Sequence, residues 1–317
     1  MKKISICIPV LNEEKNILVA YDEISNLFKS ELPNYQYEIV FTDNYSTDGT
    51  EAIIKNICDK DKFVKYVRFK NNLGYDKSIM EGYKICSGEA AIVIDCDLQD
   101  PVEIIKEFIM EWEKGYDLVY GIRKKRNENF FITFLRKLFY ILMNSKSTNH
   151  YPLNAGDFRI IDRKIINQFQ NDDNLFPYMR GITFSLSKKP KGIEYNRNDR
   201  KRGSSKLGIY NTFTYAINAL IEETPIFIRY FGRFALYLSL ITGIFTLINF
   251  VTSFAYLSFF NNVVLIILSV FSVFLSIIGD YTLRIYLHLK KTKKINYEKT
   301  LNIEKNDQFY KQEILEK

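Results

Sequence analysis

Hydrophobic and polar residues alternate in blocks along the first 120 residues of this 317-residue chain. Short apolar runs, typical of strands buried on both faces of a parallel sheet, occur at Lys3–Val10, Tyr37–Thr42, Phe63–Phe69, Ala90–Ile94 and Asp117–Tyr120. Stretches with apolar residues at helical spacing lie between them and start near Asn12, Ser46, Tyr75 and Pro101. Repeated strand–helix units predict an α/β fold with a mostly parallel sheet flanked by helices.

The residues that follow the predicted strands are the first candidates for a functional site, because ligands of such sheets bind at the carboxyl ends of the strands. These segments are Pro9–Glu13, Asp43–Thr50, Asn71–Tyr75, Asp95–Asp100 and Gly121–Arg123. Several carry carboxylates, which would repel a nucleotide unless a divalent cation lay between them. The glycine-rich dinucleotide motif and the P-loop are both absent, which argues against a Rossmann dehydrogenase and a P-loop nucleotidase.

The most informative of these segments follows the apolar strand Ala90–Ile94. Asp95 and Asp97 are two residues apart, and Gln99 adds an amide oxygen. Hard oxygen ligands of this kind suit Mg²⁺ or Mn²⁺, which commonly bridge carboxylates and substrate phosphates. The alternative is an acidic loop that only caps a helix.

The second strong pattern is a stretch without charge. No Asp, Glu, Lys or Arg occurs from Phe234 to Gly279. Because one membrane span needs about 20 residues, we expect a two-helix transmembrane hairpin with spans at 234–257 and 263–283, within a membrane segment 226–290. The alternative is a buried hairpin of a soluble core. Basic residues flank the pair on both sides, so the positive-inside rule places both flanks in the cytoplasm, including a basic tail at 291–317.

Charge and cysteine content narrow the class further. The net charge is +7, yet no nucleic-acid-binding motif accompanies it, so anionic lipid and phosphorylated ligands are the expected partners and nucleic acid is not. The four cysteines and two histidines show no zinc or disulfide spacing, and no signal peptide is recognisable at the start of the chain. We therefore expect a cytoplasmic catalytic domain on the cell (inner) membrane, held there as a multi-pass protein.

Two basic segments are candidates for contact with the membrane. Arg123–Asn144 mixes basic and aromatic residues at helical spacing and predicts an interfacial helix. Its alternative is packing against the hairpin or a neighbouring subunit, which leaves a homo-oligomer open. The run Arg197–Lys206 surrounds a Gly-Ser-Ser turn, where backbone N–H groups and guanidinium groups suit a phosphate. Its alternative is a solvated basic face.

Six motifs in order give the chain a family resemblance. They are IPVLNEE, TDNYSTDGT, NNLGYDKSIMEGYKICSGEAAIVIDCDLQDPVE, NAGDFRIIDR, YMRG and DRKRGSSKLG. Over residues 4–225 the chain resembles the family 2 glycosyltransferases of GT-A fold, and within them the bactoprenol glucosyltransferases and dolichyl-phosphate mannose synthases. The resemblance implies a GT-A domain at 1–225. The Q-x-x-R-W motif of the processive synthases is absent.

The resemblance also implies roles for individual residues. The nucleotide would be bound by Pro9, Leu11, Glu13, Phe41, Asp43, Asp95 and Cys96, and the metal by Asp95, Asp97 and Gln99. Asp97 and Asp157 would be catalytic, with Asp157 at the position often assigned as base. Phosphate groups or the acceptor would be bound by Arg123, Arg200, Ser205 and Lys206. Asn44 departs from the family, where many members carry a second aspartate, which leaves the choice of donor open.

The sequence thus predicts a membrane-anchored, inverting glycosyltransferase that depends on Mg²⁺ or Mn²⁺. It would move a sugar from a nucleotide donor to polyprenyl phosphate at the cytoplasmic face. UDP-glucose and undecaprenyl phosphate are the first choices by analogy. The alternatives are another donor, such as GDP-mannose or a UDP-amino sugar, a non-catalytic membrane scaffold that binds a nucleotide sugar, and a soluble nucleotidyltransferase.

Overall fold

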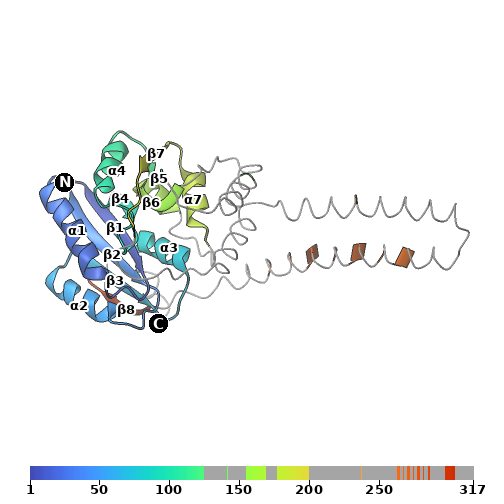
Figure 1. Ribbon diagram of the computed structural model, residues 1–317, viewed down its shortest axis with the longest axis horizontal. Helices are drawn as coiled ribbons and strands as arrows, with labels where there is room; N and C mark the ends of the chain where they lie inside the picture. The colour runs from blue at the N-terminus through green and yellow to red at the C-terminus, as the bar shows by residue number, and fades with distance from the viewer. Residues whose placement is uncertain are drawn as a thin grey trace, which may run out of the picture.

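The computed structural model describes residues 1–124, 155–168, 177–199 and 297–303, together with single helical positions between 141 and 285. Within these residues, eight strands form one sheet in the order β7-β5-β6-β4-β1-β2-β3-β8 (Figure 1). The strands are β1 (Lys3–Val10), β2 (Gln36–Asp43), β3 (Val64–Phe69), β4 (Ala90–Val93), β5 (Leu118–Arg123), β6 (Ala155–Asp162), β7 (Pro190–Tyr195) and β8 (Tyr297–Leu301).

The sheet is mixed, and the predicted parallel arrangement holds for its central part. Strands β3, β2, β1 and β4 run parallel to one another. Strand β6 is antiparallel to both β4 and β5, whereas β5 and β7 are parallel to one another. The carboxyl ends of β1 to β4 therefore meet at one edge, and the amino end of β6 lies at that same edge.

Helices cover both faces of the sheet (Figure 1). They are α1 (Ile17–Ser30), α2 (Thr50–Lys60), α3 (Tyr75–Ile85), α4 (Ile104–Glu113), α6 (Arg163–Gln168) and α7 (Met179–Leu186). Because successive strand residues point to opposite faces, Ile8 and Phe41 pack with α1, α2 and α4, while Cys7 and Val40 pack on the other face with α3 and α7. This division explains why the parallel strands read as continuous apolar runs.

Two predicted helix starts are wrong by several residues, and the cause is contact between loops. Helix α1 begins at Ile17 and α2 at Thr50, not at Asn12 and Ser46. The Asn12 side chain accepts a hydrogen bond from Thr47 N at 2.7 Å, and Asn12 N donates to Ser46 Oγ at 2.9 Å. These polar side chains therefore join the two loops and do not cap helices.

The expected transmembrane hairpin and interfacial helix lie almost wholly outside the described residues. The spans 234–257 and 263–283 lie outside the described residues except for single positions, and so does nearly all of 123–144. Among the described parts of the chain, no helix combines the length and the apolar character required to cross a membrane.

Strand β8 is an element that the sequence analysis does not anticipate, because it expects only a basic tail after residue 290. Residues Tyr297–Leu301 form an antiparallel edge strand beside β3. Their sequence, YEKTL, has no apolar run to mark it as a strand. Its partner strand is more than 200 residues away in the chain, so only the tertiary structure reveals the pairing.

A buried ionic cluster ties β1, β2 and β3 together at the end of the sheet opposite the candidate site. Glu38 is 1% exposed and accepts a hydrogen bond from Ser5 Oγ at 2.6 Å. Its Oε2 atom lies 2.8 Å from Lys3 Nζ and 3.3 Å from Lys65 Nζ. Burial alone would raise the pKa of Glu38, but Lys65, Lys3 and Ser5 outweigh it and lower the pKa from 4.5 to about 2.

We expect Glu38→Gln to destabilise the protein by about 3 kcal/mol, because it leaves the buried Lys65 without its carboxylate. The lowered pKa of Glu38 contributes stability that is present above pH 4.5 and is lost as pH falls toward about 2. The Glu38→Gln variant should lack this pH-dependent contribution to the free energy of unfolding. Urea unfolding of the purified full chain between pH 3 and pH 7 measures both effects.

The matched control is Glu111→Gln, which removes an exposed ion pair with Lys114 and should cost less than about 1 kcal/mol. Equal unfolding midpoints for the two variants would contradict the importance of the Glu38 cluster.

Candidate active site

Unusual backbone conformations gather at the carboxyl edge of the sheet. Among the described residues, four non-glycine residues have a positive φ, and three of them follow β1, β2 and β4: Asn12 (54°), Tyr45 (71°) and Leu98 (49°). Such conformations cost about 1–3 kcal/mol each and are typical of functional sites. The carboxyl edge of the sheet, where the sequence predicts the functional site, is therefore also where backbone strain is concentrated among the described residues.

The loop after β1 holds three of the predicted nucleotide ligands. Pro9 is buried at the end of the strand, while Leu11 and Glu13 are partly exposed in the loop. Glu13 N donates to Thr50 Oγ1 at 2.8 Å, and Gly49 N donates to Glu14 Oε2 at 2.9 Å. These bonds fix the loop against the start of α2.

Phe41 and Asp43, the predicted ligands on β2, are both fully buried. Asp43 Oδ1 accepts from Ser46 N at 2.8 Å, and Asp43 Oδ2 accepts from Tyr66 OH at 2.6 Å and from Arg68 Nη1 at 3.0 Å. Asp43 therefore supports the loop after β2, whereas Phe41 packs in the apolar core. A direct contact with a nucleotide stays a prediction.

The loop after β4 carries the predicted metal ligands. Asp95 Oδ1 accepts from Tyr75 OH at 2.6 Å, and Asp97 Oδ1 accepts from Gln99 N at 3.2 Å. Leu98, with its positive φ, closes this turn. Cys96 is 4% exposed and packs with the apolar core, which does not suit a thiolate ligand.

Electrostatics at this turn favour a cation. Burial and the nearby charges of Asp100 and Asp97 raise the pKa of Asp95 from 3.8 to about 6. The described part of the chain has no group of three His, Cys, Asp or Glu side chains that could hold a metal. Mg²⁺ and Mn²⁺ need no such cage, because one or two carboxylates, water and ligand phosphates complete their shell. Asp95, Asp97 and Gln99 therefore fit a divalent cation that arrives with a phosphorylated ligand.

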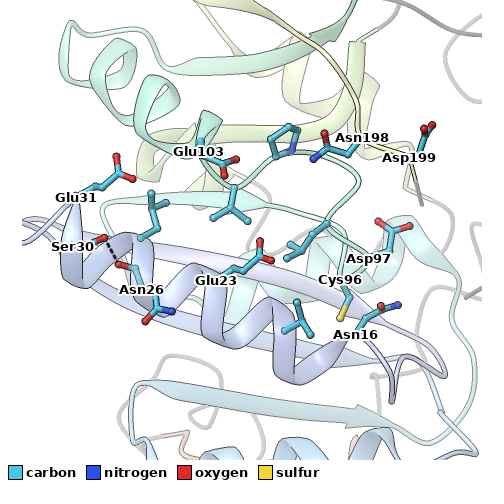
Figure 2. Close-up of a pocket in the computed structure, with 15 residues that line it drawn as sticks. Asn16, Glu23, Asn26, Ser30, Glu31, Cys96, Asp97, Glu103, Asn198 and Asp199 are labelled. Atoms are coloured by element: carbon cyan, nitrogen blue, oxygen red, sulfur yellow. Dashed lines mark hydrogen bonds between the residues drawn. The ribbon is translucent and has the colours of Figure 1, made fainter. Parts of the chain in front are cut away.

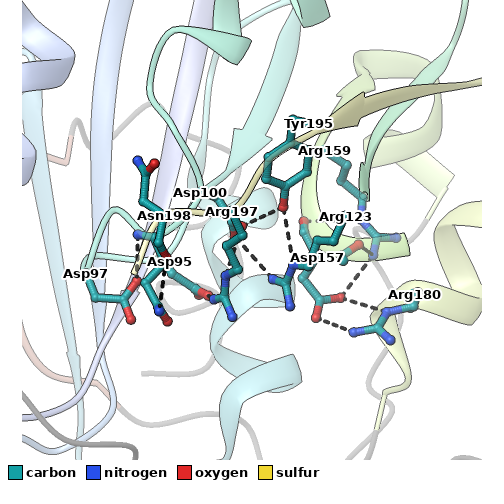
Figure 3. Close-up of polar contacts among 12 residues, drawn as sticks. Asp95, Asp97, Asp100, Arg123, Asp157, Arg159, Arg180, Tyr195, Arg197 and Asn198 are labelled. Atoms are coloured by element: carbon teal, nitrogen blue, oxygen red, sulfur yellow. Dashed lines mark hydrogen bonds and ion pairs between the residues drawn. The ribbon is translucent and has the colours of Figure 1, made fainter. Parts of the chain in front are cut away.

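A group of arginines lies next to the acidic turn, and the buried Asp100 connects the two (Figure 3). Asp100 is 1% exposed and accepts from Tyr195 OH at 2.5 Å. Its carboxylate also lies 3.3 Å from Arg123 Nη2 and 3.1 Å from Arg197 Nε. Arg197 reaches back toward the turn, with its Nη2 atom 3.8 Å from Asp95 Oδ2.

Asp157, on β6, belongs to the same arginine-rich region (Figure 3). Its Oδ1 atom lies 2.9 Å from Arg159 Nη2, and its Oδ2 atom lies 2.6 Å from Arg180 Nη2. Burial alone would raise the pKa of Asp157, but Arg180 and Arg159 outweigh it and lower the pKa to about 2. A carboxylate with this pKa accepts a proton poorly at neutral pH, so the geometry favours a positioning role for Asp157.

Arg200, Ser205 and Lys206, the remaining predicted phosphate ligands, lie outside the described residues. The chain that leads to them is described up to Asp199. Asn198 N donates to Gln99 O at 2.8 Å, and Gln99 Nε2 donates to Asn198 O at 3.4 Å. Residue 200 therefore follows a segment that is bonded to the metal-ligand turn.

The structure adds site residues to which the sequence analysis gives no role: Tyr75, Asp100, Arg180 and Tyr195. Asp100 and Arg180 lie inside motifs quoted above, D-L-Q-D-P and YMRG, so a signal for them was present. Tyr75 also lies inside a quoted motif, the one that begins NNLGYDKS. Tyr195 has no such signal, because its role depends on which carboxylate the fold places beside it.

A cavity of about 390 Å³ opens between α1 and the loop after β4 (Figure 2). Asp97 and Asn198 line it from the side of the site. No arginine or lysine is among the described residues that line it. Its charged lining residues are all acidic: Glu23, Glu31, Asp97, Glu103 and Asp199.

Comparisons with known proteins agree with the geometry. The family described as Glycosyl transferase family 2 matches residues 5–169. The bactoprenol glucosyl transferase of Shigella phage SfV is 32% identical over 309 residues, covering 92% of this chain and 97% of its own. The SfII prophage-derived bactoprenol glucosyl transferase of Shigella flexneri is 31% identical and covers 94% and 98%.

The chain is also similar to a solved structure. Glucosyl-3-phosphoglycerate synthase from Mycobacterium tuberculosis, in complex with Mg²⁺ and UDP, is 19% identical and covers 69% of this chain and 77% of its own, with a TM-score of 0.47.

Asp97→Asn should weaken the binding of Mn²⁺ by at least about tenfold, because it removes a charged ligand from the turn. Electron paramagnetic resonance of free Mn²⁺, titrated with the full chain and UDP, measures this without any assay of activity. Glu103→Gln is the control, since it removes a charge from the same cavity but not from the turn. The affinity of this variant for Mn²⁺ should stay within about twofold of that of the unchanged protein. Equal affinities for the two variants would exclude Asp97 as a ligand.

Proposed function

The chain belongs to glycosyl transferase family 2, and from this premise we propose that it transfers a sugar from a nucleotide donor to a polyprenyl phosphate. The observation that carries the proposal is the pairing of opposite charges at one sheet edge. Asp95 and Asp97 form an acidic turn suited to a cation and a diphosphate. Arg123 and Arg197, joined to that turn through Asp100, provide positive charge for a second phosphate.

In the donor half, Asp95, Asp97 and Gln99 would hold Mg²⁺ or Mn²⁺. When bound, the cation supplies Lewis-acid stabilisation of the departing nucleoside diphosphate. Tyr75, which donates to Asp95, keeps the first carboxylate oriented. The loops after β1 and β2 would receive the base and ribose.

In the acceptor half, the lipid phosphate would be bound by Arg123 together with Arg200, Ser205 and Lys206. A phosphate oxygen attacks the anomeric carbon, a new carbon–oxygen bond forms, and the bond to the nucleoside diphosphate breaks with its electron pair. Inversion at that carbon follows from the family resemblance. A phosphate monoester has a second pKa of about 6, so the acceptor is already ionised at neutral pH and needs little help from a base.

Asp157 fits this chemistry as a positioning residue. It holds Arg180 and Arg159 at the edge of the acceptor half, and its low pKa leaves it ionised throughout the working range. The arginines in turn keep the region positive enough to attract an anionic acceptor.

UDP-glucose and undecaprenyl phosphate are the proposed substrates, and the support is the name of the relatives, bactoprenol glucosyl transferase. GDP-mannose or a UDP-amino sugar is the alternative donor. Asn44, which accepts from Leu73 N at 2.7 Å at the donor edge, is the residue that leaves this choice open.

We also propose that residues 226–290 anchor the chain in the cell membrane, with the catalytic domain and the tail on the cytoplasmic side. The uncharged stretch 234–279 supports the anchor. Strand β8 supports the placement of the catalytic domain and the tail on the same side of the membrane, because it pairs with β3 in the sheet of the N-terminal domain. A chain whose two ends meet in one sheet must cross a membrane an even number of times.

The test is a transfer assay with membranes that contain the full chain, undecaprenyl phosphate and a panel of labelled nucleotide sugars. Formation of a labelled lipid with UDP-glucose, abolished by EDTA and restored by Mn²⁺, is the expected result. If label were transferred only from another nucleotide sugar, that sugar and not UDP-glucose would be the donor. Nucleotide-sugar binding without transfer or hydrolysis would indicate a scaffold and overturn the proposal.

Asp157→Asn should slow transfer by up to about 100-fold, because Arg180 and Arg159 lose their shared anchor and the acceptor is misplaced. The loss should stay constant from about pH 7 to pH 9, where the acceptor is ionised throughout. Initial rates at saturating donor measure it, with Asp162→Asn at the far end of β6 as the control. A defect that shrinks steadily as pH rises would identify Asp157 as a base.

A further inference from the structure

Arg68 links the donor edge of the site to the C-terminal strand. Its Nη1 atom donates to Asp43 Oδ2 at 3.0 Å and lies 3.4 Å from Glu51 Oε2. Its Nε atom donates to Glu298 Oε2 at 2.8 Å. The guanidinium thus lies between a fully buried carboxylate of β2 and a half-exposed carboxylate of β8.

The position of Arg68 matters because Asp43 has no contact with solvent. A buried carboxylate is costly unless it is paired, and Arg68 is the cation that the structure pairs with Asp43. Asp43 in turn accepts from Ser46 N, and Ser46 Oγ accepts from Asn12 N. Arg68 therefore stabilises, through Asp43, the two loops that would receive the nucleotide.

Strand β8 places Glu298 beside Arg68, at the irregularity in register between the pairs Arg68–Lys299 and Phe69–Tyr297. Tyr297 OH donates to Glu81 Oε2 of α3 at 2.8 Å, and Lys299 Nζ lies 2.5 Å from Glu51 Oε1 of α2. Asn302 Nδ2 donates to three carbonyl oxygens, those of Cys58, Asp61 and Val64. The strand is thus anchored to helices on both faces of the sheet as well as to β3.

We propose that strand β8 is a positioning element of the donor half of the site and that Glu298 is its positioning residue. Glu298 fixes the Arg68 guanidinium against Asp43, and Asp43 fixes the loop Asn44–Thr50. The inference rests on the proposed function, since it assigns β8 a role in binding the nucleotide donor. Because β8 follows the whole uncharged stretch 234–279, the donor half is complete only when the C-terminal segment has joined the sheet.

The competing explanation is that β8 only covers the edge of β3, as natural proteins often protect an edge strand. The two explanations differ in what a change of Glu298 alters. An edge cover affects stability and leaves substrate affinities equal. A positioning residue affects the affinity for the nucleotide and leaves the affinity for the lipid acceptor unchanged.

The experiment uses the full chain with Glu298→Gln, which keeps the size of the side chain and removes its charge. Isothermal titration with UDP and Mg²⁺ should show about 3- to 10-fold weaker binding, the effect of one partly exposed charged contact. The KM for the donor should rise by the same factor. The KM for polyprenyl phosphate, kcat at saturating donor and the Tm should stay close to those of the control Glu111→Gln.

A double-mutant cycle with Arg68→Lys tests the route of the effect. If Glu298 acts through Arg68, Glu298→Gln should weaken UDP binding much less in the Arg68→Lys background than in the unchanged chain. Additive effects, or unchanged UDP affinity in Glu298→Gln, would overturn the inference. An unchanged chain that binds no nucleotide and transfers no sugar would overturn the proposed function instead, so the two failures are distinguishable.

Discussion

Pairing of buried carboxylates with arginines is the constraint on which the candidate site depends. Asp43 is held by Arg68, Asp100 by Arg123 and Arg197, and Asp157 by Arg159 and Arg180. Each of these carboxylates is at least mostly buried, and each is paired with at least one arginine from another segment of the chain. Only Arg159 lies on the same strand as its partner, Asp157. Because leaving any of these charges unpaired in the interior costs several kcal/mol, the pairs fix the relative positions of the segments that carry them.

The same constraint explains how one sheet edge can serve two anionic ligands. The acidic turn at Asp95 and Asp97 repels phosphate by itself, and burial together with the nearby charges of Asp100 and Asp97 raises the pKa of Asp95. Asp100 draws Arg123 and Arg197 to the border of the turn. In the proposed function, a cation on one side and guanidinium groups on the other would allow a diphosphate and a second phosphate to lie close together without mutual repulsion.

The sheet contains strands from both the N-terminal and the C-terminal part of the chain. Residues 196–296 separate β7 from β8, yet the two strands belong to one sheet. Contacts from β8 reach α2, α3 and Arg68, so the last part of the chain takes part in the same network of charges as the first. The catalytic domain is therefore not a simple N-terminal module followed by an anchor, because its outermost strand comes from the far side of that segment.

The sequence by itself determined strands β1 to β5 and the acidic turn after β4, because apolar runs and the D-x-D spacing are local patterns that do not depend on distant residues. The binding of a metal by this turn stays a prediction. It also identified the family through six ordered motifs. Only the tertiary structure decided the starts of α1 and α2, the buried roles of Phe41 and Asp43, and the site contacts of Asp100, Arg180 and Tyr195. It alone revealed β8. Each of these depends on a partner tens to hundreds of residues away, and neither helical periodicity nor residue spacing records which distant charge or hydrogen-bond donor the fold will bring close.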